Sequence, residues 1–328
     1  MSQNPVKITV VKDTVELKRK NQDWKKVSGT TEMRLGDQLR KKPGTGASVK
    51  VRCGNGTSGL PFSDGEEVNL NDICPSDPRG ALDDAIPYTI SPRSTLILTN
   101  QPTLRWNATT NAKNFKVTVR GRKLNWTTQV SRDQVCQHNI CELVYPGEPP
   151  LQLEVSYILV IETDTNRSSA EITVAELGFK LIDEYKAEEV HKNAQQIEEQ
   201  NLSAREKALE VADLFTDSNL AAEAITTLEA LAKDEKSAAV YRQLGELYRW
   251  IGLPLEAEVQ YQEAVKKAEV AADKLELAAA QAGLGEVCWT LDKRDKARNL
   301  LEAAKAEYAN LGDAQAVSKL ETRLKEMK

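Results

Sequence analysis

The chain has 328 residues, of which 40% are apolar and 28% are charged, and its formal net charge at neutral pH is -5. This composition is that of a soluble globular protein, and it excludes the low-hydrophobicity regime of intrinsic disorder. At about 100 to 200 residues per domain the length predicts two or three domains, and no apolar run of the sequence reaches the roughly 18 residues that span a bilayer.

The net charge conceals an asymmetry between the N-terminus and the rest of the chain. Residues 1–52 hold 13 Lys and Arg against 5 Asp and Glu, a net charge of +8, so the remainder carries -13. Two interpretations stay open: the solvated basic face of a small domain, or attraction to an anionic partner such as cell-wall polymer, lipid headgroups or an acidic protein surface. Nucleic acid is not an expected partner, because no recognition-helix, zinc-knuckle or aromatic-and-arginine signature accompanies the charge.

Residues 1–80 are predicted to form a small all-β domain. Apolar and polar residues alternate over residues 6–11, 14–17 and 47–52, and polar or glycine-bearing turns separate these segments. Such short alternating segments are typical of strands with one buried face.

A longer pattern runs through the same region. Trp24 and Val27 precede the stretch L-G-D-Q-L-R at residues 35–40, and a glycine turn follows at residues 54–56. This combination resembles the FecR-type domain of bacterial envelope proteins, with Lys41 where that family usually has threonine. The Gly-Asp pair inside the stretch is assigned to structure, because both residue types favour turns. In combination with the sandwich and the helical repeats predicted below, this resemblance implies a bacterial envelope protein of the cyanobacterial type.

A linker and a second β domain are predicted next. Residues 73–93 contain four prolines and a glycine, a composition that breaks regular structure. Residues 81–93 are therefore predicted to form a linker. Residues 94–176 alternate again, in six short segments that predict a β-sandwich of the immunoglobulin or fibronectin type III kind. Those segments are residues 103–106, 115–120, 124–130, 141–145, 155–162 and 169–174. Trp106 and Tyr157 are expected to anchor the core of this sandwich.

The first four of the five cysteines form two local pairs, Cys53 with Cys74 and Cys136 with Cys141. No C-x-x-C occurs and the chain has only two histidines, so no metal site is expected. Two disulfides would fit an oxidising compartment, whereas four reduced thiols would fit the cytosol. Strand-like sequence begins by Lys7, as in a mature protein whose export signal has been removed. We therefore expect a periplasmic or extracytoplasmic location.

The rest of the chain is predicted to be helical, because proline becomes scarce and the apolar period changes from two residues to about 3.6. Residues 177–203 are predicted to form a connecting helix. From Tyr241 to Tyr248 the sequence reads Y-x-x-L-G-x-x-Y, and Gly252 supplies a turn. The same offsets recur 40 residues downstream and, in degenerate form, 33 residues upstream. Residues 204–328 thus resemble three tetratricopeptide-type hairpins with a C-terminal capping helix, with tyrosine in place of the usual first tryptophan.

This resemblance implies a curved array whose concave face, lined by the first helix of each hairpin, binds a protein or peptide partner. The expected partner-binding residues are Arg242, Glu246, Arg249, Trp250, Glu286, Trp289 and Thr290. Trp250 and Trp289 carry the most weight, because large aromatic side chains that point away from the packing face are good interface anchors. The alternative for both is packing against the preceding hairpin or the sandwich. The 40-residue spacing further implies that the second helix of the middle hairpin is longer than usual by more than a turn.

Catalysis is not expected, and neither is a cofactor. The sequence contains no phosphate-binding loop of the G-x-x-x-x-G-K-[ST] type, and His138 and His191 lie in contexts that would not activate a nucleophile. The predicted fold class is multidomain α+β, two small all-β domains followed by an all-α repeat array. This architecture predicts a non-enzymatic adaptor or scaffold of the bacterial cell envelope. Two alternatives stay open: a FecR-like signalling component, or a structural subunit of a larger assembly.

Overall fold

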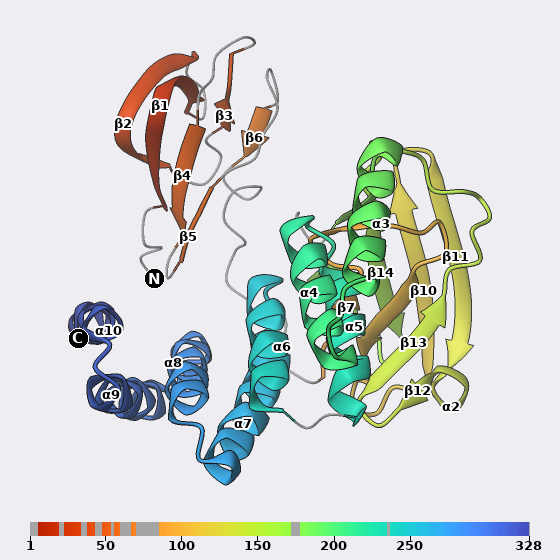
Figure 1. The fold of residues 1–328 in the computed structure, drawn as a ribbon. Coiled ribbons are helices and arrows are strands. Elements are labelled where there is room, and N and C mark those ends of the chain that lie inside the picture. Colours follow the sequence, from red (N-terminus) through yellow and green to blue (C-terminus); the bar gives the residue numbers. More distant parts are fainter. Residues whose placement is uncertain are drawn as a thin grey trace. The chain divides into compact units, whose positions relative to one another are not determined.

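The computed structural model describes residues 6–19, 23–33, 38–42, 48–53, 56–59, 67–69, 85–171, 178–234 and 237–327. The chain divides into two compact units, Met1–Asp77 with Thr173–Glu176, and Pro78–Ile172 with Leu177–Lys328. Strands make up the described part of the first unit, and the second holds a β-sandwich followed by a helical array (Figure 1). The predicted α+β class, with β structure before an all-α array, is confirmed.

The described strands of the first unit form one antiparallel sheet. Its order is β5-β4-β1-β3-β6, and β2 also pairs with β1. The strands are β1 (Val6–Lys18), β2 (Lys25–Met33), β3 (Gln38–Arg40), β4 (Ser48–Cys53), β5 (Gly56–Gly59) and β6 (Glu67–Asn69). The predicted pairing of Cys53 with Cys74 lies outside this description, because Cys74 is not among the described residues.

The alternation at the start of the chain predicts two short segments, but β1 is one strand of 13 residues. Its buried apolar residues change parity along the strand, from Ile8 and Val10 to Val15 and Leu17. The pairing register shifts between Val10 and Val15, where Asp13 has φ 63. Over this stretch β1 advances five residues and β2 only two. The three extra residues, an odd number, bring both apolar sets to one face, which explains why the alternation in the sequence is interrupted.

Two residues of the FecR-like pattern meet in this sheet. The Arg40 guanidinium lies 4.1 Å from the centroid of the Trp24 ring, and its Nε donates a hydrogen bond of 2.8 Å to the carboxylate of Glu16. This hydrogen bond lowers the pKa of the Glu16 carboxyl; burial opposes the change, and Lys42 reinforces it. Trp24 and Arg40 thus serve packing and ion pairing inside the sheet.

The sandwich of the second unit consists of two sheets that share one apolar core. One sheet has the order β11-β10-β14, and the other has the order β12-β13-β9-β7. The strands are β7 (Thr89–Ser91), β9 (Thr103–Asn107), β10 (Asn114–Gly121), β11 (Leu124–Ser131), β12 (Cys136–Gln137), β13 (Ile140–Val144) and β14 (Ile158–Thr163). Trp106 and Tyr157 are both buried in the core, as predicted, and Trp106 makes an edge-on contact with Phe115. A disulfide joins Cys136 and Cys141 across β12 and β13.

Three segments differ from their predicted state. Residues 89–91, expected in the linker, form β7 and pair with β9. Residues 169–171, expected in a strand, form a 3-10 turn, and residues 172–174 lie outside the description. The expected connecting helix begins with strand β15 (Phe179–Leu181), which pairs in parallel with β8 (Thr95–Ile97), and α3 (Glu184–Glu198) starts only after Asp183 caps it. Pairing partners decide the state of such short segments: β7 pairs with β9 about 15 residues further along the chain, and β15 pairs with β8, which lies 84 residues before it.

Three antiparallel helical hairpins and a last helix follow α3. The helices are α4 (Ala204–Asp217), α5 (Ala221–Asp234), α6 (Ala238–Trp250), α7 (Pro254–Ala271), α8 (Lys274–Thr290), α9 (Arg294–Asn310) and α10 (Ala314–Glu326). Local capping fixes several starts, since Ser203 and Glu206 form a capping box and Asp273 and Asp313 accept hydrogen bonds from the first turns of α8 and α10.

The extra residues that make the repeat spacing 40 residues long lie in two helices. The second helix of the middle hairpin, α7, has 18 residues against 14 in α5, so it is longer by just over a turn, as predicted. The first helix of the next hairpin, α8, has 17 residues against 13 in α6, which the sequence did not indicate. The extra length therefore lies on both sides of the turn at Ala272, whose φ is 53.

A buried arginine joins the sandwich to the array. Arg93, only 6% exposed, donates hydrogen bonds from Nε to the carbonyl of Ile251 at 2.8 Å and from Nη2 to that of Gly252 at 3.3 Å. Its Nη1 donates to the carbonyl of Thr89 at 3.2 Å. Burial lowers the pKa of Arg93 to about 10, with Glu256 opposing, so the group stays charged at neutral pH. One guanidinium thus ties β7 to the turn between α6 and α7.

Further contacts cross the same joint. Tyr88 and Ile90 lie in one apolar cluster with residues of α5, α6 and α7. Arg105 of β9 forms an ion pair of 3.0 Å with Glu229 of α5, and the hydroxyl of Tyr248 donates to the same carboxylate at 2.6 Å. Because an apolar cluster and buried polar contacts connect them, the sandwich and the first two hairpins form a continuous body.

Candidate peptide-binding groove

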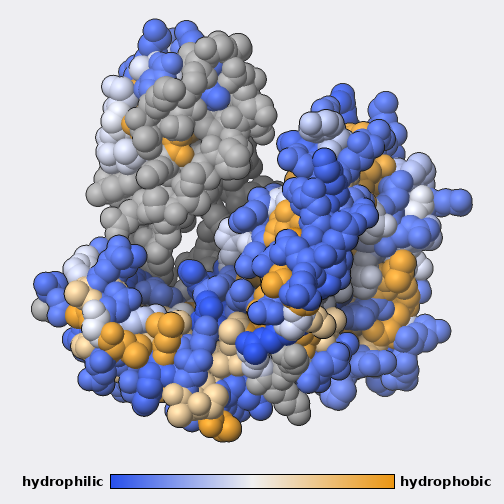
Figure 2. Space-filling model, in the orientation of Figure 1, coloured by the Kyte–Doolittle hydropathy of each residue, from blue (hydrophilic) through white to orange (hydrophobic). Residues whose placement is uncertain are grey.

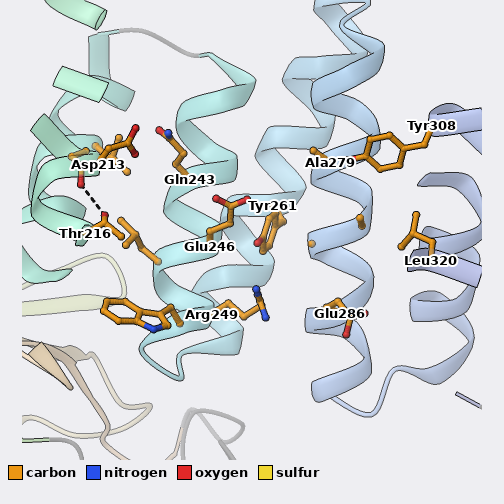
Figure 3. Close-up of a pocket in the computed structure, with 16 residues that line it drawn as sticks. Asp213, Thr216, Gln243, Glu246, Arg249, Tyr261, Ala279, Glu286, Tyr308 and Leu320 are labelled. Atoms are coloured by element: carbon orange, nitrogen blue, oxygen red, sulfur yellow. Dashed lines mark hydrogen bonds between the residues drawn. The ribbon is translucent and has the colours of Figure 1, made fainter. Parts of the chain in front are cut away.

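The inner face of the array contains a hollow of about 560 Å³, lined by side chains of α4 to α10. Its main residues are Asp213, Thr216, Gln243, Glu246, Arg249, Trp250, Tyr261, Ala279, Glu286, Tyr308 and Leu320. Figure 3 shows Asp213 and Thr216 at one end, Glu246 and Tyr261 in the middle, and Tyr308 and Leu320 at the other end. We call this hollow the groove.

Glycines on two helices make room for the floor of the groove. Tyr261 of α7 is 1% exposed, and its ring lies between Gly245 of α6 and Gly283 of α8. A Cβ added at Gly245 would lie 2.8 Å from the ring, and one at Gly283 would lie 2.3 Å from it. Burial raises the pKa of the Tyr261 hydroxyl to about 12, with Arg249 opposing. The hydroxyl is therefore neutral under ordinary conditions.

Ion pairs tie the first helices together along the groove. Arg242 of α6 binds Glu276 of α8 through Nε at 2.7 Å and Nη2 at 3.3 Å, and it also binds Glu246 at 2.6 Å. Burial disfavours the charge of Arg242, but these two carboxylates outweigh it and raise its pKa. Arg323 of α10 makes a bidentate pair with Glu286 at 2.8 and 2.9 Å. Such forked pairs fix side-chain orientation as well as charge.

The α4 end of the groove is acidic. Partial burial raises the pKa of the Asp213 carboxyl, and the nearby carboxylates of Asp217, Glu246 and Glu210 add to the rise, while Arg242 opposes it. Among the residues that the structure describes, the three α4 carboxylates make no ion pair. This end therefore carries uncompensated negative charge.

Four of the seven predicted partner-binding residues line the groove. They are Glu246, Arg249, Trp250 and Glu286. Trp250 is 50% exposed, which is unusual for so large an apolar side chain, and it lies beside Arg249 at the end of α6. Whether these residues bind a partner stays a prediction.

The other three predicted residues lie elsewhere. Arg242 is occupied by the ion pairs described above. Trp289 is half-buried and packs against apolar clusters of the array, with the Arg294 guanidinium 3.7 Å from its ring centroid. The hydroxyl of Thr290 donates to the carbonyl of Glu286 at 3.1 Å. Their binding roles also stay predictions, and for Trp289 the packing alternative describes the contacts found.

Several groove residues were not predicted from the sequence, although the repeat pattern could have predicted one of them. Asp213 occupies, in the degenerate upstream hairpin, the position that Glu246 and Glu286 occupy in the next two, since the offsets are 33 and 40 residues. Extending the repeat alignment to all three first helices would have found it. Tyr308 and Leu320 carry no such signal, because they come from second and capping helices.

The visible face of the helical array is mostly hydrophilic, with hydrophobic residues in separate patches (Figure 2). Among the described residues, no group of three or more His, Cys, Asp or Glu is placed to hold a metal ion. Within the same residues, no helix is long and apolar enough to cross a membrane.

Part of this chain resembles several solved structures at low sequence identity and low TM-score. Solved structures with similar helices include MamA, at 18% identity over 45% of this chain and 96% of that chain, with a TM-score of 0.30. They also include BtubC (BKLC) from P. vanneervenii, at 16% identity over 44% of this chain and 72% of that one, with a TM-score of 0.32. A putative kinesin light chain from Podosopora anserina with TPR-like repeats matches at 16% identity over 44% of this chain and 85% of that one, with a TM-score of 0.32.

These likenesses concern helical arrangement and carry no argument about function. No curated protein matches the chain. Residues 236–306 match the family model of the tetratricopeptide repeat. This stretch covers α6, α7 and α8 and most of α9, which form the two hairpins with the clearest pattern. The helices of residues 236–306 are therefore tetratricopeptide repeats.

Proposed function

We propose that this protein is a non-enzymatic adaptor or scaffold that binds a partner protein or peptide in the groove. The observation that carries the proposal is the half-exposed Trp250 at a hollow of about 560 Å³ whose floor is the buried ring of Tyr261. A hollow of this size takes one or two side chains of a partner segment. Tryptophan is the residue type most enriched among side chains that dominate binding energy.

The proposal places the protein in the envelope of a bacterium, outside the cytoplasm. The disulfide between Cys136 and Cys141 supports an oxidising compartment, and the FecR-like pattern of residues 1–80 and the immunoglobulin-like alternation of residues 94–176 support the envelope setting. The net charge of +8 in residues 1–52 supports a second contact, with an anionic surface such as cell-wall polymer or lipid headgroups.

Capture from native cells tests the groove proposal. The full chain, its Trp250→Ala variant and its Val270→Ala variant are immobilised in parallel, and bound proteins are quantified by mass spectrometry. Val270 is 87% exposed and does not line the groove, so it controls for the loss of an exposed apolar side chain. We expect Trp250→Ala to weaken binding of the partner roughly 30-fold, about 2 kcal/mol, and Val270→Ala to change nothing. Equal capture by all three forms would refute the proposal.

A further inference from the structure

We infer that the groove selects a partner segment carrying lysine or arginine, with the cation held at the α4 end and an apolar side chain against Trp250. This inference rests on the proposed function and adds the chemistry of the partner. It is carried by the distribution of charge along the three first helices.

Acidic residues recur at one position of the repeat. The residue after the small packing residue of each first helix is Asp213 in α4, Glu246 in α6 and Glu286 in α8. All three line the groove. Because stacked repeats place equivalent positions side by side, these carboxylates form a stripe across the inner face.

Two members of the stripe are compensated by arginines within the array. Glu286 is held by Arg323 of α10, and Glu246 by Arg242 of α6. Arg242 also binds Glu276, whose carboxylate accepts hydrogen bonds from its Nε at 2.7 Å and from its Nη2 at 3.3 Å. One guanidinium therefore serves two carboxylates, and little of its charge is left for Asp213.

The third member has no such compensation. Asp213 lies near Glu210 and Asp217 of its own helix, and all three are without an ion pair among the described residues. The combined repulsion contributes to the raised pKa of Asp213. Among the described residues that line the groove, Arg249 is the one cation, and it lies beside Tyr261, whose pKa it lowers. When the arginines and the carboxylates at the groove are counted together, the net charge is negative, and the carboxylates without an ion pair lie on α4.

A neutral group adds a hydrogen-bond acceptor to the same end. Gln243 of α6 is half-buried and lines the groove, and its Oε1 atom is buried without a hydrogen-bond partner among the residues that the structure describes. Figure 3 shows its amide group on the side of α6 that faces Asp213. Buried acceptors of this kind are costly unless a donor reaches them. A peptide N–H or a lysine ammonium in the groove would supply that donor.

Binding is expected to be coupled to the protonation of Asp213. A ligand cation favours the carboxylate, so it lowers the raised pKa of Asp213 toward its ordinary value of 3.8 and releases protons on binding. The affinity should therefore fall on acidification, beginning above the pH at which an ordinary aspartate titrates. The charged groups that face Asp213 are Glu210 and Asp217 on α4, and Glu246 and Arg242 on α6.

Paired synthetic peptides test the inference. Two fluorescein-labelled alanine-rich 12-residue peptides share one tryptophan and one leucine and differ only in two charged positions, lysine in one and glutamate in the other. Their affinities for the full chain are measured by fluorescence anisotropy at low and high salt. We expect the lysine peptide to bind roughly tenfold more tightly at low salt, and the advantage to shrink with salt as exposed charges are screened.

Variants locate the source of the selectivity. Neutralising the α4 carboxylates together, by Glu210→Gln, Asp213→Asn and Asp217→Asn, should weaken the lysine peptide roughly tenfold and leave the glutamate peptide unweakened. Asp295→Asn is the matched control, because Asp295 is exposed on α9 and does not line the groove. Circular dichroism checks that each variant is folded.

The remaining outcomes separate this inference from the proposed function. If both peptides bind equally and Trp250→Ala weakens both, the charge selectivity is wrong and the groove proposal stands. If the glutamate peptide binds more tightly, Arg249 dominates and the inference is overturned. If neither peptide binds, the inference is overturned too, and the capture experiment alone judges the proposed function.

Discussion

Replacing Arg93 with methionine is expected to lower the free energy of unfolding of the second unit by about 3 kcal/mol. The variant leaves the carbonyls of Thr89, Ile251 and Gly252 without their donor inside a buried joint. Each unsatisfied buried carbonyl costs roughly 1 to 3 kcal/mol. The variant also avoids burying a cation, which offsets part of this loss. Methionine fills a similar volume, so the loss reports mainly on the polar contacts.

The measurement for Arg93 is urea unfolding followed by circular dichroism, with two control variants. Arg93→Lys keeps the charge but cannot present a planar fork to three carbonyls, so an intermediate loss is expected. Arg122→Met removes an exposed arginine of the sandwich and should change stability by less than about 0.5 kcal/mol. If Arg93→Met were as stable as Arg122→Met, the polar contacts of Arg93 would contribute nothing to the stability of the joint.

Gly283→Val is expected to destabilise the array by about 1 to 3 kcal/mol. A Cβ at this position would lie 2.3 Å from the Tyr261 ring, and the ring cannot retreat because Gly245 lies against its other side. Glycine is a poor helix former, so an added side chain with free space would stabilise the helix by up to about 1 kcal/mol. The clash is larger than this gain, and the sign of the change therefore tests the close approach of α7 and α8.

A double-mutant cycle separates the clash from other effects of valine. In a Tyr261→Leu background the ring is absent, so Gly283→Val should cost clearly less than in the wild type, with a coupling of at least about 1 kcal/mol. The unfolding free energies of the four proteins give this value. Additive losses would mean that the valine acts elsewhere, and the glycine would then have no role in forming the groove floor.

The repeat array was predictable because close helix approach leaves a mark in the sequence. Small residues recur where backbones meet, as at Gly245 and Gly285, and large ones recur where they fill the space between helices, as at Tyr248. Caps such as Ser203 then fix the starts to within a residue or two. The three hairpins and the last helix consequently lie where the pattern placed them.

Elements that depend on distant partners were not predictable in the same way. β7 and β15 are three residues long, and each is a strand only because β9 or β8 lies beside it. Their sequences contain no alternation long enough to signal a strand. The prolines around β7 indicated a linker, although Arg93 connects this segment to the turn between α6 and α7 by hydrogen bonds.

The different exposure of Trp250 and Trp289 could not be predicted from the sequence. Trp250 follows Arg249, whereas Trp289 occupies the repeat position of Arg249 itself, so the two differ by one residue, or about 100° around a helix. Near Trp289 the capping helix contributes Arg323, which lies 5.7 Å from the ring. Only the packing of α10 reveals that one tryptophan is covered and the other is half-exposed.

The central claim, that a partner segment binds in the groove, is tested most directly by methyl NMR of the full chain labelled at alanine methyl groups. Ala279 and Ala282 line the groove, whereas Ala187 lies on α3 outside it. Saturation with the lysine peptide is predicted to shift the methyl signals of Ala279 and Ala282 and to leave that of Ala187 in place. Shifts confined to methyl groups outside the groove at saturation would contradict the account.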